Sequence, residues 1–188
     1  VLLKNIIGLL DPDTGSIKIN STEMVNLPRK DKENLLLQWG ITCQHGALFD
    51  SLRIWENIIF KIQNQQKISK VNGRKLALSI IERLSLKPEI LDLFPSEISG
   101  GMQKRVAIAR GLINKPSIVL ADEPTGNLDS VTSEIIVDLM KSMAKKLNQT
   151  FIIVTHDRKH FGNVDKVITI KDGKAFQGEE PSTMEITV

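Results

Sequence analysis

Four polar residues that could do chemistry each follow a short apolar run. The runs and the residues after them are IVLA before Asp122 and Glu123, FIIVT before His156, and GITC before Gln44. Short all-apolar runs are typical of parallel strands buried on both faces. Open parallel sheets bind ligands beyond the carboxyl ends of their strands. We therefore expect these four residues to gather at one edge of a sheet.

Asp122 and Glu123 are expected to serve different tasks, because neighbouring side chains of a strand project to opposite faces. One carboxylate could hold a hard cation such as Mg²⁺, which prefers oxygen ligands and keeps several waters. The other could orient or deprotonate an attacking water. Taken singly, Asp-Glu after a strand is also typical of a solvated strand end, and a lone histidine such as His156 is more often structural. The prediction of a site therefore depends on their convergence.

The stretch SEISGGMQKRVAIARG opens a basic helix with a serine and two glycines. Ser99 is a good N-cap residue, whereas glycine inside a helix costs about 1 kcal/mol relative to alanine. Gly100 and Gly101 leave bare N–H groups at the positive end of the helix, which favours phosphate binding. The alternative is a plain N-capped amphipathic helix with a flexible entry.

The first half of the chain is predicted to contain two short strands and a helical segment. A helix over residues 2–10 stops at DPDTG and is followed by a strand at SIKI, and a second strand is expected over residues 39–43. Residues 51–113 show helical periodicity throughout. Their central helix has an apolar face predicted from a spacing of four, formed by Leu76, Ile80 and Leu84.

Strands and helices alternate from Ser117 onward. IVLA, FIIV and VITI are strand-like runs, and a helix is expected over residues 132–147. Strands separated by helices predict right-handed βαβ units and a mostly parallel sheet. The apolar side of that helix consists of Ile136, Met140, Met143 and Leu147.

The composition of the chain bears on whether it contacts nucleic acid, contains a disulfide or crosses a membrane. Its 188 residues carry a formal net charge of +3, from basic and acidic residues spread along the sequence, which indicates a solvated surface rather than a nucleic-acid footprint. Cys43 is the single cysteine, so an internal disulfide is excluded and a small core residue in a reducing compartment is expected. No apolar run approaches the length of a membrane span, so membrane contact is expected only through a partner.

With these motifs assembled, the chain resembles the ATP-binding subunit of ABC transporters over nearly its whole length. ISGGMQKRVAIAR is similar to the family signature, SIVLADE to the Walker B strand, and GNLD, ending at Asp129, to the D-loop. His156 is similar to the switch histidine, and CQHGALFDSLRIWENI to the Q-loop and the start of the helical subdomain.

The resemblance implies a P-loop NTPase-like α/β fold, with a mostly parallel sheet, helices on both faces and an inserted all-helical subdomain. Residues 1–50 and 114–188 would form the ATPase core, and residues 51–113 the helical subdomain. It also implies ATP and Mg²⁺ as cofactors. The active unit would be a homodimer on the cytoplasmic face of the inner membrane, bound to an integral membrane permease, with no nucleic-acid partner and no direct membrane insertion.

The resemblance also implies roles for individual residues. Asp122 would support Mg²⁺ through water, Glu123 would polarise the attacking water, and His156 would contact the γ-phosphate. Gln44 would sense the metal and couple to the permease, and Asp129 would link the two sites across the dimer.

The signature motif would cover the γ-phosphate of ATP held by the partner subunit. The residues implied in this contact are Ser99, Gly100, Gly101 and Met102. Met102 departs from the family pattern, which has glutamine three residues after the serine, so the capping box Ser-x-x-Gln is lost.

A second departure is that G-x-x-x-x-G-K-[ST], the phosphate-binding loop, does not occur in the sequence. VLLKNIIGLL resembles the helix that follows this loop in the family. We therefore expect the loop upstream of Val1, an active ATPase in the longer parent protein, and little activity in the 188-residue chain alone.

The subfamily signals point in two directions. SGGM and GALFDSL resemble the Mla-type phospholipid transport ATPases, and ADEPTGNLD is similar to ATPases of lipoprotein-release, macrolide-export and cell-division systems. The lipid-transport interpretation is favoured, because the Q-loop segment meets the membrane partner. Alternatives of other classes are a non-transport ABC ATPase acting on ribosomes or DNA and a noncatalytic regulatory module.

Overall fold

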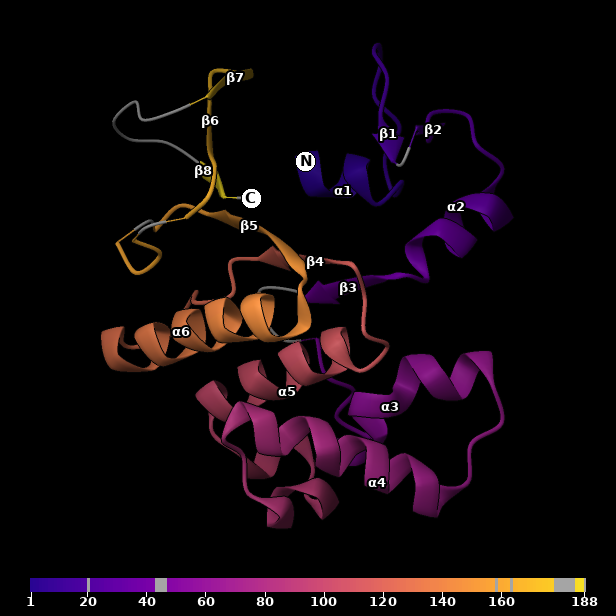
Figure 1. Cartoon of the computed structure of the whole chain (residues 1–188), viewed down its shortest axis with the longest axis vertical. Coiled ribbons are helices and arrows are strands. Elements are labelled where there is room, and N and C mark those ends of the chain that lie inside the picture. Colours follow the sequence, from indigo (N-terminus) through magenta and orange to yellow (C-terminus); the bar gives the residue numbers. More distant parts are fainter. Residues whose placement is uncertain (20, 43–46, 158, 163, 178–184, 188) are drawn as a thin grey trace.

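The computed structural model describes residues 1–188 except 20, 43–46, 158, 163, 178–184 and 188 (Figure 1). Cys43 and Gln44 lie outside the described residues. The elements, in chain order, are α1 (Leu2–Ile6), β1 (Lys18–Ile19), β2 (Thr22–Glu23), α2 (Arg29–Leu36), β3 (Trp39–Thr42), α3 (Ile54–Gln65), α4 (Lys70–Ile81), η1 (Glu82–Leu84), η2 (Pro88–Asp92), η3 (Pro95–Glu97), α5 (Gly100–Leu112), β4 (Ile118–Asp122), α6 (Ser130–Leu147), β5 (Thr150–Thr155), β6 (Val167–Lys171), β7 (Lys174–Gln177) and β8 (Glu185–Thr187).

The main sheet has the strand order β3-β4-β5-β8-β6-β7. Strands β3, β4 and β5 pair in parallel, with Gly40 opposite Val119 and Val119 opposite Phe151. β8 pairs antiparallel with both β5 and β6, so β6 runs in the same direction as β5. β7 is also antiparallel to its neighbour β6. The parallel half of the sheet therefore brings the carboxyl ends of β3, β4 and β5 to one edge.

Helices cover both faces of the parallel strands, as the sequence predicts (Figure 1). Alternation along β4 divides its side chains between two apolar clusters. Val119 and Ala121 join the larger one, which includes buried apolar residues of both α5 and α6. Leu120 faces a smaller cluster with Trp39, against which residues of α1 and α2 pack. Because both faces of β4 are buried, the all-apolar run IVLA is explained.

The helical segment contains α3, α4 and α5, which contact one another. The apolar face predicted for α4 is shifted: Leu76 is 38% exposed, whereas Ile80 and Leu84 are buried together with Ala77. A spacing of four drifts around a helix of 3.6 residues per turn, so a three-residue stripe leaves the core at one end. Gly73 is also buried in α4, where a Cβ atom would collide with Ile59 of α3.

Two further differences concern the first half of the chain. The helix predicted over residues 2–10 ends at Ile6, because Gly8 takes a positive φ of 67° that stops the helix. The strand at SIKI is reduced to Lys18–Ile19, which pairs with β2 in a separate two-stranded sheet. Over the described residues, no helix is both long and apolar enough to span a membrane.

Candidate active site

The carboxyl ends of β4 and β5 lie side by side, because Asp122 is paired with Val154 in the parallel ladder. The chain turns sharply after Asp122: Glu123 has a positive φ of 45°, and its N–H donates to the Val154 carbonyl at 2.8 Å. Its own carbonyl accepts the N–H of Gly126 at 3.0 Å. The turn directs the Glu123 side chain toward the end of β5.

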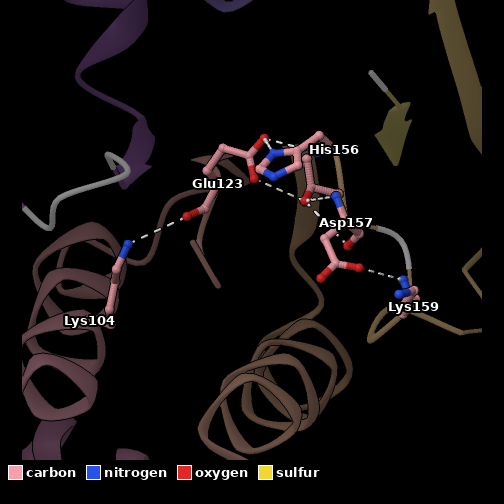
Figure 2. A network of polar contacts seen from close by, with 6 residues as sticks. Lys104, Glu123, His156, Asp157 and Lys159 are labelled. Carbon is pink, nitrogen blue, oxygen red and sulfur yellow. Dashed lines mark hydrogen bonds and ion pairs between the residues drawn. The ribbon is translucent and has the colours of Figure 1, made fainter. Parts of the chain in front are cut away.

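The Glu123 carboxylate is almost fully engaged by residues at the end of β5 (Figure 2). Oε1 accepts the backbone N–H of His156 at 2.9 Å and lies 2.7 Å from Nδ1 of the same residue. Oε2 accepts the hydroxyl of Thr155 at 3.1 Å. The Glu123 side chain is 12% exposed, so its charge is held in a partly desolvated place by three protein groups.

Glu123 also changes the ionisation of His156. The hydrogen bond and the charge of Glu123, with a smaller effect of Asp157, raise the pKa of the His156 imidazole above its ordinary value. The ring is 72% exposed, so water screens this ion pair and the histidine has room to rotate. The site thus pairs a shielded carboxylate with an exposed imidazole whose pKa is raised.

Asp122 and Glu123 have different environments, as their adjacency predicts. Asp122 ends β4 and is exposed, whereas Glu123 is buried. Among the described residues no group of three or more histidine, cysteine, aspartate or glutamate side chains could hold a metal ion. One exposed carboxylate fits a cation such as Mg²⁺ that keeps most of its waters. Gln44, the other predicted metal residue, is among the undescribed positions.

Thr155 is a site residue that the sequence pattern did not predict. It is fully buried, donates to Glu123 and accepts the N–H of Asp157 at 3.0 Å. The one signal in the sequence is the hydroxyl residue at the end of the run FIIVT, directly before His156.

The start of α5 gives the two signature glycines different surroundings. Ser99 is the N-cap, and its hydroxyl accepts the N–H of Met102 at 3.4 Å. Gly100 is exposed, and a Cβ atom there would meet no atom within 4 Å. At Gly101 a Cβ atom would lie 2.7 Å from Cγ2 of Thr132 in α6. The lack of a side chain at Gly101 is therefore already required by packing inside the chain, and only Gly100 is open.

Met102 and Asp129 have local roles besides those implied by the resemblance. Met102 is half-buried and packs against the larger apolar cluster. Asp129 is the N-cap of α6 and accepts both the N–H and the hydroxyl of Thr132, at 2.9 and 2.7 Å. These bonds hold the pKa of the Asp129 carboxyl below its ordinary value. Through Thr132, Asp129 lies beside the start of α5 and not within the hydrogen-bonded group around Glu123.

The fold and the site define an α/β cassette with a carboxylate–histidine pair beyond its parallel strands, and comparisons with known proteins identify its family. The model of the ABC transporter family matches residues 1–126. The chain is 36% identical to the lipoprotein-releasing system ATP-binding protein LolD of Shewanella denitrificans, over 94% of this chain and 76% of that protein. It is 34% identical to the probable ribonucleotide transport ATP-binding protein mkl of Mycobacterium leprae, over 84% of this chain and 45% of that protein.

Solved structures agree with this assignment. The dimeric structure of MJ0796, a bacterial ABC transporter cassette, superposes with a TM-score of 0.81 at 32% identity, over 94% of this chain and 78% of that one. A dimeric post-hydrolysis state of the same cassette, bound to ADP and Pi, gives 0.79 at 31% identity, with the same coverage. The chain belongs to the ABC transporter family and has the fold of its ATP-binding cassette.

Proposed function

We propose that this chain provides the water-activating site of an ATP-hydrolysing ABC subunit that drives lipid transport through a membrane permease. The observation that carries the proposal is the Glu123 carboxylate, shielded at the end of β4 and bound by Thr155 and His156. A carboxylate in such a place can orient and deprotonate an attacking water. The exposed His156 ring can swing from Oε1 of Glu123 to a γ-phosphate, which frees one acceptor position on that oxygen for the water while the backbone N–H of His156 stays bound.

Mg²⁺ would be held by Asp122 through bound waters and would neutralise charge that develops on the phosphate groups. The open Gly100 and the N–H groups at the start of α5 would receive the γ-phosphate of ATP bound by a second subunit. Ser99, Gly101 and Met102 would complete that contact, and Asp129 would lie near the subunit boundary. A dimer is consistent with the dimeric cassettes that the chain resembles.

The permease is proposed to bind in a groove between α2, β3 and α3. The groove has a volume of about 600 Å³, and its apolar walls include Leu37 and Phe49, which are 40% and 42% exposed. Phe60 packs on Phe49 with ring centroids 4.4 Å apart. Lys61 donates to the carbonyls of Leu36 and Trp39 at 3.3 and 2.7 Å, joining α3 to the core, and burial lowers the pKa of its amine.

Introducing a charge into this groove provides a direct test. Leu37→Glu should abolish co-purification of the permease, because the new carboxylate would be buried against apolar groups. Leu9→Glu is the matched control, since Leu9 is 69% exposed and lies outside the groove. Equal permease recovery with both variants would contradict a docking role for the groove.

Phospholipid and lipoprotein are the two substrate classes to be separated. The motifs SGGM and GALFDSL favour phospholipid, whereas the likeness to LolD of Shewanella denitrificans favours lipoprotein release. ATP hydrolysis by the subunit–permease complex, measured in liposomes with and without an acylated lipoprotein, distinguishes them. Stimulation only by the lipoprotein would refute phospholipid transport.

Removal of the general base tests the hydrolytic role itself. In the full-length subunit, Glu123→Gln should lower kcat by about 10²–10⁴-fold while ATP binding is preserved, the range for loss of a general base. Weakened ATP binding with normal turnover would contradict this role. Residues 1–188 contain no G-x-x-x-x-G-K-[ST] motif, so we expect this chain alone to bind ATP weakly. Micromolar affinity in calorimetry would refute that expectation.

A further inference from the structure

Lys104 of α5 reaches across to the loop that carries Glu123. It lies one helical turn after Gly100, and its Nζ donates to the backbone carbonyl of Glu123 at 3.4 Å (Figure 2). Lys104 is half-buried, so its side chain is partly shielded from bulk water. A side chain of α5, the signature helix, which begins at the signature glycines, thus contacts the backbone of Glu123, the proposed general base, in the same subunit.

The backbone at Glu123 needs such support. Its φ of 45° places it in the left-handed region, which is strained for a residue other than glycine. Strain of this kind persists only where the surroundings over-determine the conformation. The N–H of Glu123 is fixed by the Val154 carbonyl at 2.8 Å, and its carbonyl accepts both Gly126 N–H, at 3.0 Å, and Lys104. Lys104 is the one of these partners that comes from the signature helix.

The charge of Lys104 fits this position. Burial lowers the pKa of its amine, and the carboxylates of Glu123 and Asp122 act in the opposite direction. The ammonium group therefore lies within the field of both carboxylates at the end of β4. Their attraction offsets only part of the cost of partly burying a cation, so the pKa of the amine stays below its ordinary value.

We propose that Lys104 is a positioning residue for ATP hydrolysis, which fixes the peptide of Glu123 and links it to the start of α5. The inference rests on the proposed function. In the dimer, the helix that would receive the partner's ATP at Gly100 would also hold the general base of its own subunit. If α5 moves when that ATP binds, Lys104 would transmit the movement to the backbone of Glu123.

The test is Lys104→Met in the full-length subunit assembled with its permease. Methionine keeps the apolar stem and removes the donor. We expect kcat to fall by about tenfold, equivalent to about 1.4 kcal/mol in the activation barrier, with the KM for ATP within about twofold of the wild type. Lys104→Arg restores a donor and should keep kcat within about threefold. Lys75→Met, at an exposed position of α4, is the control and should leave both constants unchanged.

Wild-type kcat in the Lys104→Met variant, while Glu123→Gln abolishes turnover, would overturn the role of Lys104 and leave the proposed function intact. A rise in KM without loss of kcat, or an equal loss in the Met and Arg variants, would also overturn it, because the donor would not act on the chemical step. Failure of Lys104→Met to fold would make Lys104 a folding residue and refute the proposal. Absence of ATP hydrolysis by the wild type would refute the proposed function itself.

Discussion

Alanine substitution at each of the two signature glycines should have opposite effects on stability. At Gly101 a new Cβ atom would lie 2.7 Å from Cγ2 of Thr132, closer than non-bonded carbon atoms pack, so one of the two must shift. Overpacking of this kind costs about 1–3 kcal/mol. At Gly100 a Cβ atom meets nothing within 4 Å, and alanine is the better helix former by up to about 1 kcal/mol. Gly101→Ala should therefore destabilise the chain, whereas Gly100→Ala should not.

Thermal unfolding of the 188-residue chain measures both effects. A change of 1 kcal/mol corresponds to about 2–4 °C in Tm for a domain of this size. Both variants gain helix propensity and only Gly101→Ala has the clash, so its Tm should lie about 2–12 °C below that of Gly100→Ala. Thr132→Ser removes the clashing Cγ2 methyl and keeps the hydroxyl that donates to Asp129. In the double variant most of the lost stability should return. Equal Tm values for Gly101→Ala and Gly100→Ala, or no recovery in the double variant, would refute the clash with Thr132.

Gly100→Ala should impair ATP-dependent function even though it does not lower stability. Gly100→Ala, although stable, places a methyl group where the γ-phosphate of the partner's ATP is proposed to bind, so ATP-dependent dimerisation and ATP turnover by the proposed ATPase should fall. The measurement is phosphate release together with light scattering in ATP. Normal dimerisation and turnover in Gly100→Ala would refute the proposed contact with nucleotide at this position.

Two further predictions concern His156 of the site and Asn57 of α3, which binds the backbone of Phe49 beside the groove. Glu123 raises the pKa of the His156 imidazole, so in NMR the ring should titrate above its ordinary pKa near 6.5, and Glu123→Gln should lower that pKa again. The stabilisation from this pair is present below about pH 6.5 and is lost as the pH rises through the folded pKa. An imidazole pKa that is not raised would contradict the ion pair. Asn57→Ala should lower Tm by several degrees. The buried amide of Asn57 accepts the Phe49 N–H at 2.7 Å and donates to the carbonyls of Phe49 and Leu52 at 3.0 Å, and each buried group left without a partner costs about 1–3 kcal/mol. An unchanged Tm would show that water replaces the amide.

Local patterns in the sequence determined much of the framework. The all-apolar runs predicted β4 and β5, and parallel pairing of their ends brought Glu123 and His156 together, as expected. Ser99 was recognisable as an N-cap because the serine hydroxyl acts on the N–H groups of its own first turn, here that of Met102. These predictions succeeded because strand burial, helix capping and parallel topology depend on residues near one another in the sequence or on a general rule of sheets.

Other features were decided only by tertiary packing. Thr155 and Lys104 bind Glu123 across 32 and 19 residues of sequence, and no local pattern encodes such contacts. Leu76 was predicted for the core but is exposed, because the orientation of α4 is set by α3. The left-handed turn at Glu123 could not be read from its residue type, which disfavours that conformation.

The sequence by itself determined the class of protein, the strand ends that carry its chemistry and the glycine-rich start of α5. The tertiary structure decided which glycine is open, since Gly101 is closed by Thr132 and Gly100 is not, and which oxygen of Glu123 each partner binds. The physical reason is range: periodicity and capping act within a few residues, whereas the approach of α5 to α6 and of Lys104 to β4 depends on how whole elements pack.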